Sequence, residues 1–456
     1  MDLIIKSKKI FEQLNIKELQ KAGIEREDIK HSSHSHIIVT YPPYGSLPEI
    51  NFKEIYSNSS SKSRREIAFY LHVPFCTGKC LYCPYITLAK QPVEKVNEYI
   101  DTLEKEIKLL LKYPALSEVI LNSIYIGGGT PTYLQPQQLE RIFKIIRDNF
   151  TIKSGAEITV EAEPDTIISK EGKERLKTLL KNGVNRLSIG FQTFNNDILK
   201  FIGRRHTSEQ ATEAYNIAKE TGFENINIDL ITGLPDQTLE IWENDLMQAM
   251  KINPSSITCY PFYLKEGTGL WSIFKKEPQR FSTNELVILM NIMTAEFFKE
   301  YKFIQRPVRW FAKEPRYMYH QQLFKWEEMG EQLAIGPSSY SFINDFQYFN
   351  RKNISDYLDS VNKGDLPIER GVKLDNDDLM RRLIIFGLKS QLRKKIFKNK
   401  FNLEPKEVCK EIWNKLENLD LIEENNEIIQ LSYKGKLFAD EVAKEFFSDE
   451  IKKSLK

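Results

Sequence analysis

Between residues 66 and 263 the sequence repeats one unit: an apolar run of strand length, a turn, and a stretch with apolar residues at helical spacing. Strands that alternate with helices in this way pair in parallel, because each helix crosses one face of the sheet. The repeats predict an α/β fold, an incomplete (β/α)6 barrel whose chemistry gathers at the C-terminal ends of the strands. The expected strands are Glu66 to Phe75, Ser123 to Gly128, Glu157 to Ala162, Arg186 to Gln192, Asn225 to Thr232 and Ser256 to Tyr263.

The helices between these strands show one apolar face each. The first is expected to begin near Val93, where Pro92 suits the first turn and Val96 and Ile100 continue the apolar face. Gly183 and Gly222 stand where two of the later helices should end. The later helices are expected at Gln137 to Phe150, Ser169 to Asn182, Ser208 to Thr221 and Leu239 to Lys251.

The chain of 456 residues is long enough for several domains at about 100–200 residues each. We expect an N-terminal extension over 1–60, ending in a Ser-rich linker at 57–63, and the partial barrel over 61–270. An aromatic-rich extension that borders the substrate is expected over 271–375. A winged-helix-like module is expected over 376–456, with a helix at 406–419, a hairpin across 424–426 and a helix from Tyr433 capped by Ser432.

Charge and hydropathy argue against two classes of partner. Lys and Arg number 65 and Asp and Glu number 63, a net charge of +2 that gives no strong electrostatic attraction to nucleic acid. The predicted wing carries Glu423, Glu424 and Glu427, which would repel phosphate. The sequence has no apolar run of about 18 residues and no apolar leader after Met1, so we expect no membrane span and a cytoplasmic protein.

Three of the five cysteines lie together. Cys76, Cys80 and Cys83 follow the first strand with the spacing C-x3-C-x2-C. Three reduced structural cysteines or a zinc site are the alternatives, although structural zinc wants a fourth ligand and Cys259 and Cys409 are isolated. Three thiolates on an iron–sulfur cluster would leave one iron open to an external ligand, which favours a catalytic cluster.

Polar residues follow the next strands at the same edge. Gly127 to Thr130 form a glycine-rich turn in which backbone groups can approach a ligand, without the pattern of a phosphate loop. The alternative for the polar side chains is an internal network without a ligand. These side chains are Glu161 and Glu163 on strand three, Gln192 and Arg204 after strand four, and Asp229 on strand five.

Tyr82 completes the pattern C-x3-C-x-Φ-C, and with it the chain resembles the radical S-adenosylmethionine (SAM) enzymes. This resemblance implies a [4Fe–4S] cluster held by the three cysteines, with SAM on the open iron. In order along residues 37–456, the motifs are similar to those of the oxygen-independent coproporphyrinogen III oxidase-like group. That resemblance implies contacts to SAM from Tyr70, Gly128, Gly129, Thr130, Glu161, Gln192, Arg204 and Asp229. It places Tyr82 and residues near Tyr263 beside a second SAM.

Two departures bear on the reaction. The oxidase pattern has a cysteine where this chain has Tyr85, and its N-terminal motif is replaced by Val39 to Tyr44. The chain also has 75 residues ahead of Cys76, more than the heme-chaperone relatives. The segments Trp310 to Lys313 and Gly336 to Ser341 resemble the class C methyltransferase and anaerobic heme-opening branches.

We therefore expect a radical SAM enzyme that uses a second SAM for methyl or methylene transfer to a tetrapyrrole or another conjugated small molecule. The alternatives are oxidative decarboxylation, as in the oxidase, and heme binding and delivery. The expected partners are that substrate and a reducing donor such as flavodoxin or ferredoxin. The pattern identifies no catalytic residue, no single substrate and no oligomeric state.

The sequence leaves two alternatives each for the roles of a histidine cluster and of one further histidine. His31, His34 and His36 form a short cluster that binds a metal or is simply solvated. His72, beside the cysteine loop, is a residue near the substrate or a hydrogen-bonded core histidine.

Overall fold

A computed structural model of the chain describes residues 2–25, 38–50, 55, 65–116 and 118–455. The predicted linker at 57–63 and the cluster of His31, His34 and His36 lie outside the described residues.

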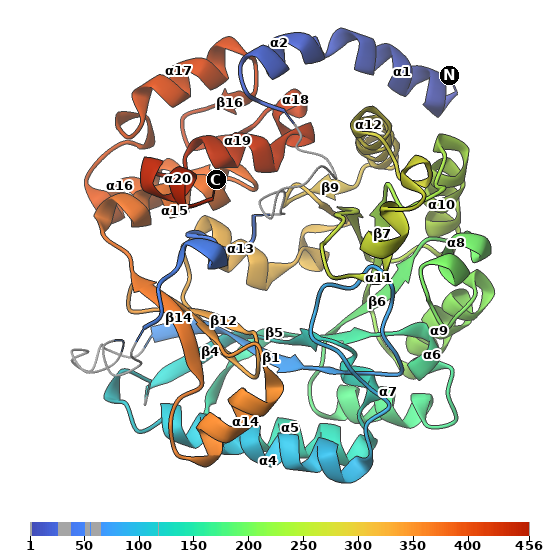
Figure 1. The fold of residues 1–456 in the computed structure, drawn as a ribbon, viewed down its shortest axis with the longest axis vertical. Coiled ribbons are helices and arrows are strands. Elements are labelled where there is room, and N and C mark those ends of the chain that lie inside the picture. Colours follow the sequence, from blue (N-terminus) through green and yellow to red (C-terminus); the bar gives the residue numbers. More distant parts are fainter. Residues whose placement is uncertain (1, 26–37, 51–54, 56–64, 117, 456) are drawn as a thin grey trace.

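The centre of the molecule is one curved sheet of twelve strands (Figure 1). Six of them pair in parallel in chain order and form the predicted partial barrel. Two agree with the expected bounds, and the others shift at their ends. They are β1 (Arg65–Val73), β4 (Val119–Gly128), β5 (Thr151–Ala162), β6 (Arg186–Gln192), β7 (Asn225–Thr232) and β8 (Ser256–Pro261).

Five helices cover the outside of this sheet, as the apolar periodicity predicts (Figure 1). They are α4 (Val93–Leu110), α5 (Pro136–Asn149), α7 (Gly172–Lys181), α9 (Ser208–Thr221) and α10 (Leu239–Ile252). Gly222 ends α9 at φ +120°, a left-handed conformation that costs glycine little. The expected start at Ser169 is wrong by three residues, because Ser169 caps the preceding turn and α7 begins at Gly172.

The aromatic-rich region extends the same sheet at both edges. β10 (Trp310–Ala312) and β9 (Ile304–Gln305) follow β8. At the other edge β11 (Gln332–Ile335) pairs in parallel with β1, and antiparallel partners continue outward. These are β12 (Tyr340–Ile343), β13 (Phe346–Asn350) and β14 (Ile368–Lys373). Three α-helices lie wholly in this region among the described residues, α12 (Asn284–Glu300), α13 (His320–Glu327) and α14 (Ile354–Asn362).

The C-terminal module has a small antiparallel sheet of β15 (Leu392–Arg393), β17 (Ile428–Leu431) and β16 (Ile422–Glu424). Ser432 caps the following helix as expected, its hydroxyl accepting from Gly435 N. The expected helix at 406–419 starts late: a 3₁₀ turn over Pro405–Glu407 precedes it, and Cys409 has φ +57°. The other helices are α15 (Asn376–Leu388), α16 (Lys394–Phe401), α17 (Lys410–Asn418), α18 (Tyr433–Leu437), α19 (Ala439–Glu445) and α20 (Asp449–Ser454).

The two ends of the chain share a hydrophobic core. Leu14 and Leu19, near the short helices α1 (Leu3–Gln13) and α2 (Ile16–Lys21), belong to one buried cluster with Trp413 and Phe446 of the module. This core is separate from the larger one beneath the barrel helices. Among the described residues, no helix combines the length and apolar character needed to span a membrane.

Candidate functional site

The cysteine loop leaves the sheet where β1 ends. Cys76 lies on the short strand β2 (Phe75–Cys76), and Cys80 and Cys83 follow before β3 (Leu88–Ala89). Thr130 Oγ1 donates to Cys76 Sγ at 3.2 Å, and Arg204 Nη1 lies 3.6 Å from Cys80 Sγ. Burial raises the pKa of all three thiols, that of Cys76 to about 12, because a thiolate is poorly solvated there.

In the described part of the chain, no three His, Cys, Asp or Glu side chains form a group arranged to hold a metal ion. A cluster spreads its cysteine ligands over different irons, so it does not require all three thiols to meet at one point. The assignment of Cys76, Cys80 and Cys83 as cluster ligands stays a prediction.

The glycine turn after β4 packs directly on the start of the cysteine loop. Gly129 N donates to Val73 O and Thr130 N donates to Phe75 O, both at 2.7 Å. A Cβ at Gly129 would lie 2.7 Å from Phe75 O, and one at Gly128, where φ is +115°, would lie 2.4 Å from the His72 ring. Only glycine fits both positions, so the turn brings its backbone against the loop.

Glu161 fixes that turn from β5. Its carboxylate accepts from Gly128 N at 2.9 Å and from the Tyr125 hydroxyl at 2.5 Å. Burial raises the pKa of Glu161 to about 7; the two hydrogen bonds lower it, and Asp229 and Glu163 raise it further. The carboxyl group of Glu161 is therefore protonated in part of the molecules near neutral pH.

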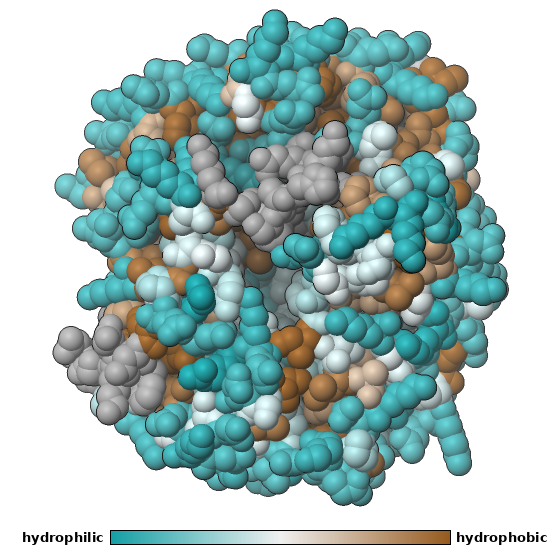
Figure 2. Space-filling model, viewed as in Figure 1, coloured by the Kyte–Doolittle hydropathy of each residue, from teal (hydrophilic) through white to brown (hydrophobic). Residues whose placement is uncertain are grey.

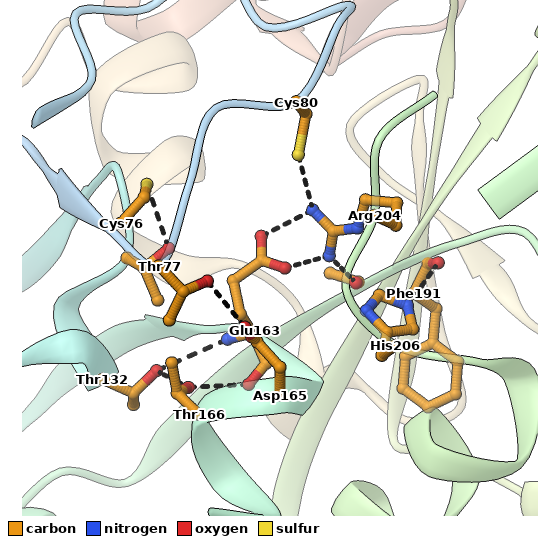
Figure 3. A network of polar contacts seen from close by, with 12 residues as sticks. Cys76, Thr77, Cys80, Thr132, Glu163, Asp165, Thr166, Phe191, Arg204 and His206 are labelled. Carbon is orange, nitrogen blue, oxygen red and sulfur yellow. Dashed lines mark hydrogen bonds and ion pairs between the residues drawn. The ribbon is translucent and has the colours of Figure 1, made fainter. Parts of the chain in front are cut away.

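Glu163 and Arg204 form the second half of the site (Figure 3). Arg204 Nη1 donates to Glu163 Oε1 at 2.8 Å, while Nη2 contacts the other carboxylate oxygen and donates to Gly190 O at 2.6 Å. Burial disfavours the charge of Arg204, but the neighbouring Glu163 outweighs this effect. The pKa of Arg204 is therefore raised well above its usual value. Figure 3 shows Arg204 between Cys80 and Glu163, which joins the cysteine loop to β5.

Gly190 gives three of these side chains room to meet. A Cβ there would lie 2.7 Å from Gln192 Nε2, 3.3 Å from Arg204 Nη2 and 3.4 Å from Glu163 Oε1. Gln192 reaches this point because its own φ is +69° and the pairing of β6 with β7 shifts register there. A bulge of this kind turns a side chain away from its regular direction and is frequent beside active sites.

Asp229 lies deeper in the barrel. Ser188 donates to it at 3.0 Å and Asn227 Nδ2 donates to it at 2.9 Å. Burial raises its pKa above the ordinary value, against these hydrogen bonds and the charge of Arg186. The charge of Asp229 raises the pKa of Glu161, and both carboxyls raise the pKa of Tyr125, so the two carboxyls belong to one electrostatic environment.

The tyrosines predicted from the motif lie at the two halves of the site. The Tyr70 hydroxyl lies 3.0 Å from His72 Nδ1, and its ring stacks on Tyr125 at 6.0 Å between centroids. Tyr82 is 3.4 Å from Arg204 Nη1. His72 is buried, and that burial lowers its pKa to about 4. Among the described residues, its Nε2 has no hydrogen-bond partner.

Sequence reasoning missed several residues that support the site. Thr77 donates to Asp165 at 2.6 Å, and Thr132 and Thr166 share a hydrogen bond at 2.7 Å; together these contacts hold the segment after β5 beneath the cysteine loop (Figure 3). Glu163, the residue just after β5, was not missed, because it alternates with Glu161 along the chain and shares its face. The threonines gave no such signal, because they come from different loops.

The aromatic-rich region reaches the barrel interior. Trp310 lies 5.9 Å from Tyr319, Tyr319 lies 5.6 Å from Tyr125, and Tyr260 lies 5.9 Å from Trp310, all between ring centroids. Figure 2 shows that the face of the molecule seen in Figure 1 is hollowed near its centre.

Comparisons with known proteins agree with this geometry. The model of the radical SAM superfamily matches residues 70–248, and that of the HemN C-terminal domain matches residues 374–438. The oxygen-independent coproporphyrinogen III oxidase of Escherichia coli is 30% identical over 71% of this chain and 72% of its own length. The heme chaperone HemW of Bacillus subtilis is 28% identical over 83% of this chain and 99% of its own length.

The solved structure of coproporphyrinogen III oxidase from Escherichia coli superposes with a TM-score of 0.77 at 26% identity, covering 90% of this chain and 96% of that one. The open sheet with a C-terminal helical module is therefore the fold of this group. The cofactors that the group uses fit three thiols beside a glycine turn, together with the buried Nε2 of His72, which has no partner within the described part of the chain. The chain belongs to the coproporphyrinogen III oxidase-like group of radical SAM enzymes, whose cofactors are a [4Fe–4S] cluster and SAM.

Proposed function

We propose that this protein cleaves SAM reductively in the barrel and directs the resulting radical to a tetrapyrrole. The observation that carries the proposal is the convergence of Glu163, Gln192 and Arg204 on Gly190, directly beside Cys80. Buried charges of this kind are costly unless they pair with each other or with a polar ligand. Relatives named as oxidases and heme chaperones support the tetrapyrrole class.

Each group has a defined part in this proposal. Cys76, Cys80 and Cys83 would hold the cluster, which when bound supplies the electron that cleaves SAM to a 5′-deoxyadenosyl radical. The Gly128 and Gly129 backbone would receive the methionine end of SAM, and Glu161 would accept from its ribose. Gln192, Arg204 and Asp229 would complete the contacts, with Tyr70 and Tyr82 at either side. A reducing donor of the flavodoxin or ferredoxin class would supply the electron.

The three hypotheses differ in what happens to the substrate: decarboxylation, methyl transfer or delivery without reaction. The named relatives support oxidative decarboxylation or heme delivery, and they give no support to methyl transfer from a second SAM. The departures at Tyr85 and at Val39 to Tyr44 still separate this chain from the oxidase pattern. Methyl transfer remains a prediction of the sequence, and a product assay separates the three.

The assay is anaerobic. The reconstituted protein is given reductant, SAM and either coproporphyrinogen III or heme, and 5′-deoxyadenosine, S-adenosylhomocysteine and carbon dioxide are measured together. 5′-Deoxyadenosine with carbon dioxide indicates decarboxylation, and 5′-deoxyadenosine with S-adenosylhomocysteine indicates methyl transfer. Heme binding without formation of 5′-deoxyadenosine, S-adenosylhomocysteine or carbon dioxide indicates delivery and contradicts the proposed turnover.

A further inference from the structure

We propose that Lys352 and Arg370, held on the ring of Tyr44, form a subsite for a carboxylate of the substrate at the mouth of the barrel. This inference rests on the proposed tetrapyrrole function and names the chemical feature that is recognised. The two cations lie at the two ends of the connection between β13 and β14, which contains α14: Lys352 comes just after β13 and Arg370 is on β14.

Strand directions place these cations at the same edge as the cysteine loop. β11 runs parallel to β1, and β12 and then β13 each reverse direction, so β13 runs parallel to β1 as well. The residues after β13 therefore leave the sheet at the C-terminal edge, where the cysteine loop and the glycine turn lie. Because β14 reverses again, its first residues, with Arg370, return to that edge.

Tyr44 organises the two charges. Lys352 Nζ lies 3.2 Å from the centroid of its ring, and the Arg370 guanidinium carbon lies 5.5 Å from it. Arg370 Nη1 donates to Leu47 O at 2.8 Å, and the Tyr44 hydroxyl donates to Glu369 at 2.9 Å. The ring thus keeps two cations near each other without neutralising either one, since a cation–π contact leaves the charge in place.

The local charge favours an anion. Glu369 is the carboxylate that faces this cluster, and it is occupied by the Tyr44 hydroxyl. Burial lowers the pKa of Lys352, Glu369 offsets part of this effect, and Lys265, which follows β8, and Arg370 lower the pKa further because they repel its charge. An incoming carboxylate would relieve this repulsion and accept charge-assisted hydrogen bonds.

A flat substrate with acidic side chains matches this arrangement. The barrel interior offers Tyr125, Tyr319 and Trp310 to a conjugated ring system. The Lys352 and Arg370 pair lies at the rim, where a peripheral carboxylate of the same molecule would stay. The subsite would orient the ring relative to the SAM site, which makes it a specificity determinant and not a catalytic group.

A binding experiment without reductant tests the subsite alone. The probes are coproporphyrin III and its tetramethyl ester, titrated against the holoprotein and followed by porphyrin fluorescence. We expect Lys352→Met to weaken binding of the free acid about fivefold, the scale of one partly solvated ion pair, and Lys352→Arg to restore it. The ester should bind the unchanged protein and the Lys352→Met variant alike.

Lys373→Met is the matched control. Lys373 lies on β14, the strand of Arg370, and contacts Phe346 at 5.8 Å by a similar cation–π contact, but it lies at the opposite end of that strand. Its removal should leave both affinities unchanged. Equal binding of acid and ester by the unchanged protein, or an unaffected Lys352→Met variant, overturns the subsite. Acid binding through Lys352 in a protein that cleaves no SAM would instead refute the proposed function and leave the subsite standing.

Discussion

At the scale of single residues, the site is built from side chains that act in pairs across loops. Arg204 neutralises Glu163 and reaches Cys80, and Glu161 holds the backbone of Gly128. These contacts explain why charged groups are tolerated at the strand ends, and they lead to two predictions.

Cys80→Ala should abolish cluster assembly and SAM cleavage, because two remaining thiols cannot complete the predicted ligand set. Visible absorption of the anaerobically reconstituted protein and 5′-deoxyadenosine formation measure the two effects. Cys409→Ser is the matched control, since Cys409 lies in the C-terminal module and should leave both unchanged. A full iron–sulfur spectrum in Cys80→Ala would remove Cys80 from the ligand set.

Glu161→Gln should weaken SAM binding about 10- to 100-fold and spare the cluster, because a hydrogen bond to a charged acceptor is lost. Equilibrium dialysis with SAM measures the affinity. Glu157→Gln is the control: Glu157 lies four residues earlier on the same strand, where it accepts from the first N–H groups of α13. That variant should lower stability and leave SAM affinity unchanged; equal SAM affinity in both variants would contradict the assignment.

At the scale of elements, the apolar periods predicted most of the barrel. β6, β7 and α9 have the expected bounds, because one face of each is continuously apolar. The strands β9 to β14 could not be assigned, since most are two to five residues long, and β11 also pairs with β1, which lies far away in the chain. The motifs located Glu161 and Asp229, but only the fold shows that Tyr125 donates to the first carboxylate and Ser188 to the second.

The buried carboxyl of Glu106 connects α4 to the turn after β11, to β13 and to α14. Glu106 on α4 is 1% exposed and accepts from Gly336 N, Asn350 Nδ2 and the Tyr357 hydroxyl at 2.6 to 2.9 Å. Burial raises its pKa to about 7, while these hydrogen bonds lower it. Between pH 4.5 and 7 the folded state therefore retains a proton that the unfolded state has lost, and stability falls as the pH rises.

Glu106→Gln should remove this dependence. Relative to the unchanged protein, the variant should gain up to about 3 kcal/mol of unfolding free energy between pH 5 and pH 8. Urea titrations at the two pH values measure the difference. A difference between the two proteins that does not change with pH would show that Glu106 is ionised throughout.

At the scale of the whole molecule, a buried ion cluster joins the C-terminal module to the barrel. Asp440 on α19 accepts from Lys389 Nζ at 2.6 Å, pairs with Arg309 and accepts from Ile38 N at 3.1 Å. The Tyr263 hydroxyl, after β8, lies 3.4 Å from the same carboxylate. One carboxylate thus connects the N-terminal segment and the C-terminal module to the segment that follows β8, a contact that no local sequence pattern predicts.

Asp440→Asn should destabilise the protein by about 3 to 5 kcal/mol, because two buried cations lose their counter-ion. Limited proteolysis should then cut between the barrel and the module. Glu417→Gln is the control: Glu417 pairs with Lys406 on the surface, where the loss should be at most about 1 kcal/mol. Equal stability of the two variants would show that the buried cluster does not hold the module.

The pairing of β1 with β11 has a consequence for how the chain is made. Ala68 and Leu71 lie in register opposite Gln332 and Ile335, which leave the ribosome long after the cysteine loop has been synthesised. Until then the strand that leads into Cys76 is an open edge with unpaired N–H and C=O groups, the kind of edge on which nascent chains aggregate. The strand β1, which leads into the loop of Cys76, Cys80 and Cys83, therefore gains its second neighbour, β11, only when the last third of the chain has been synthesised.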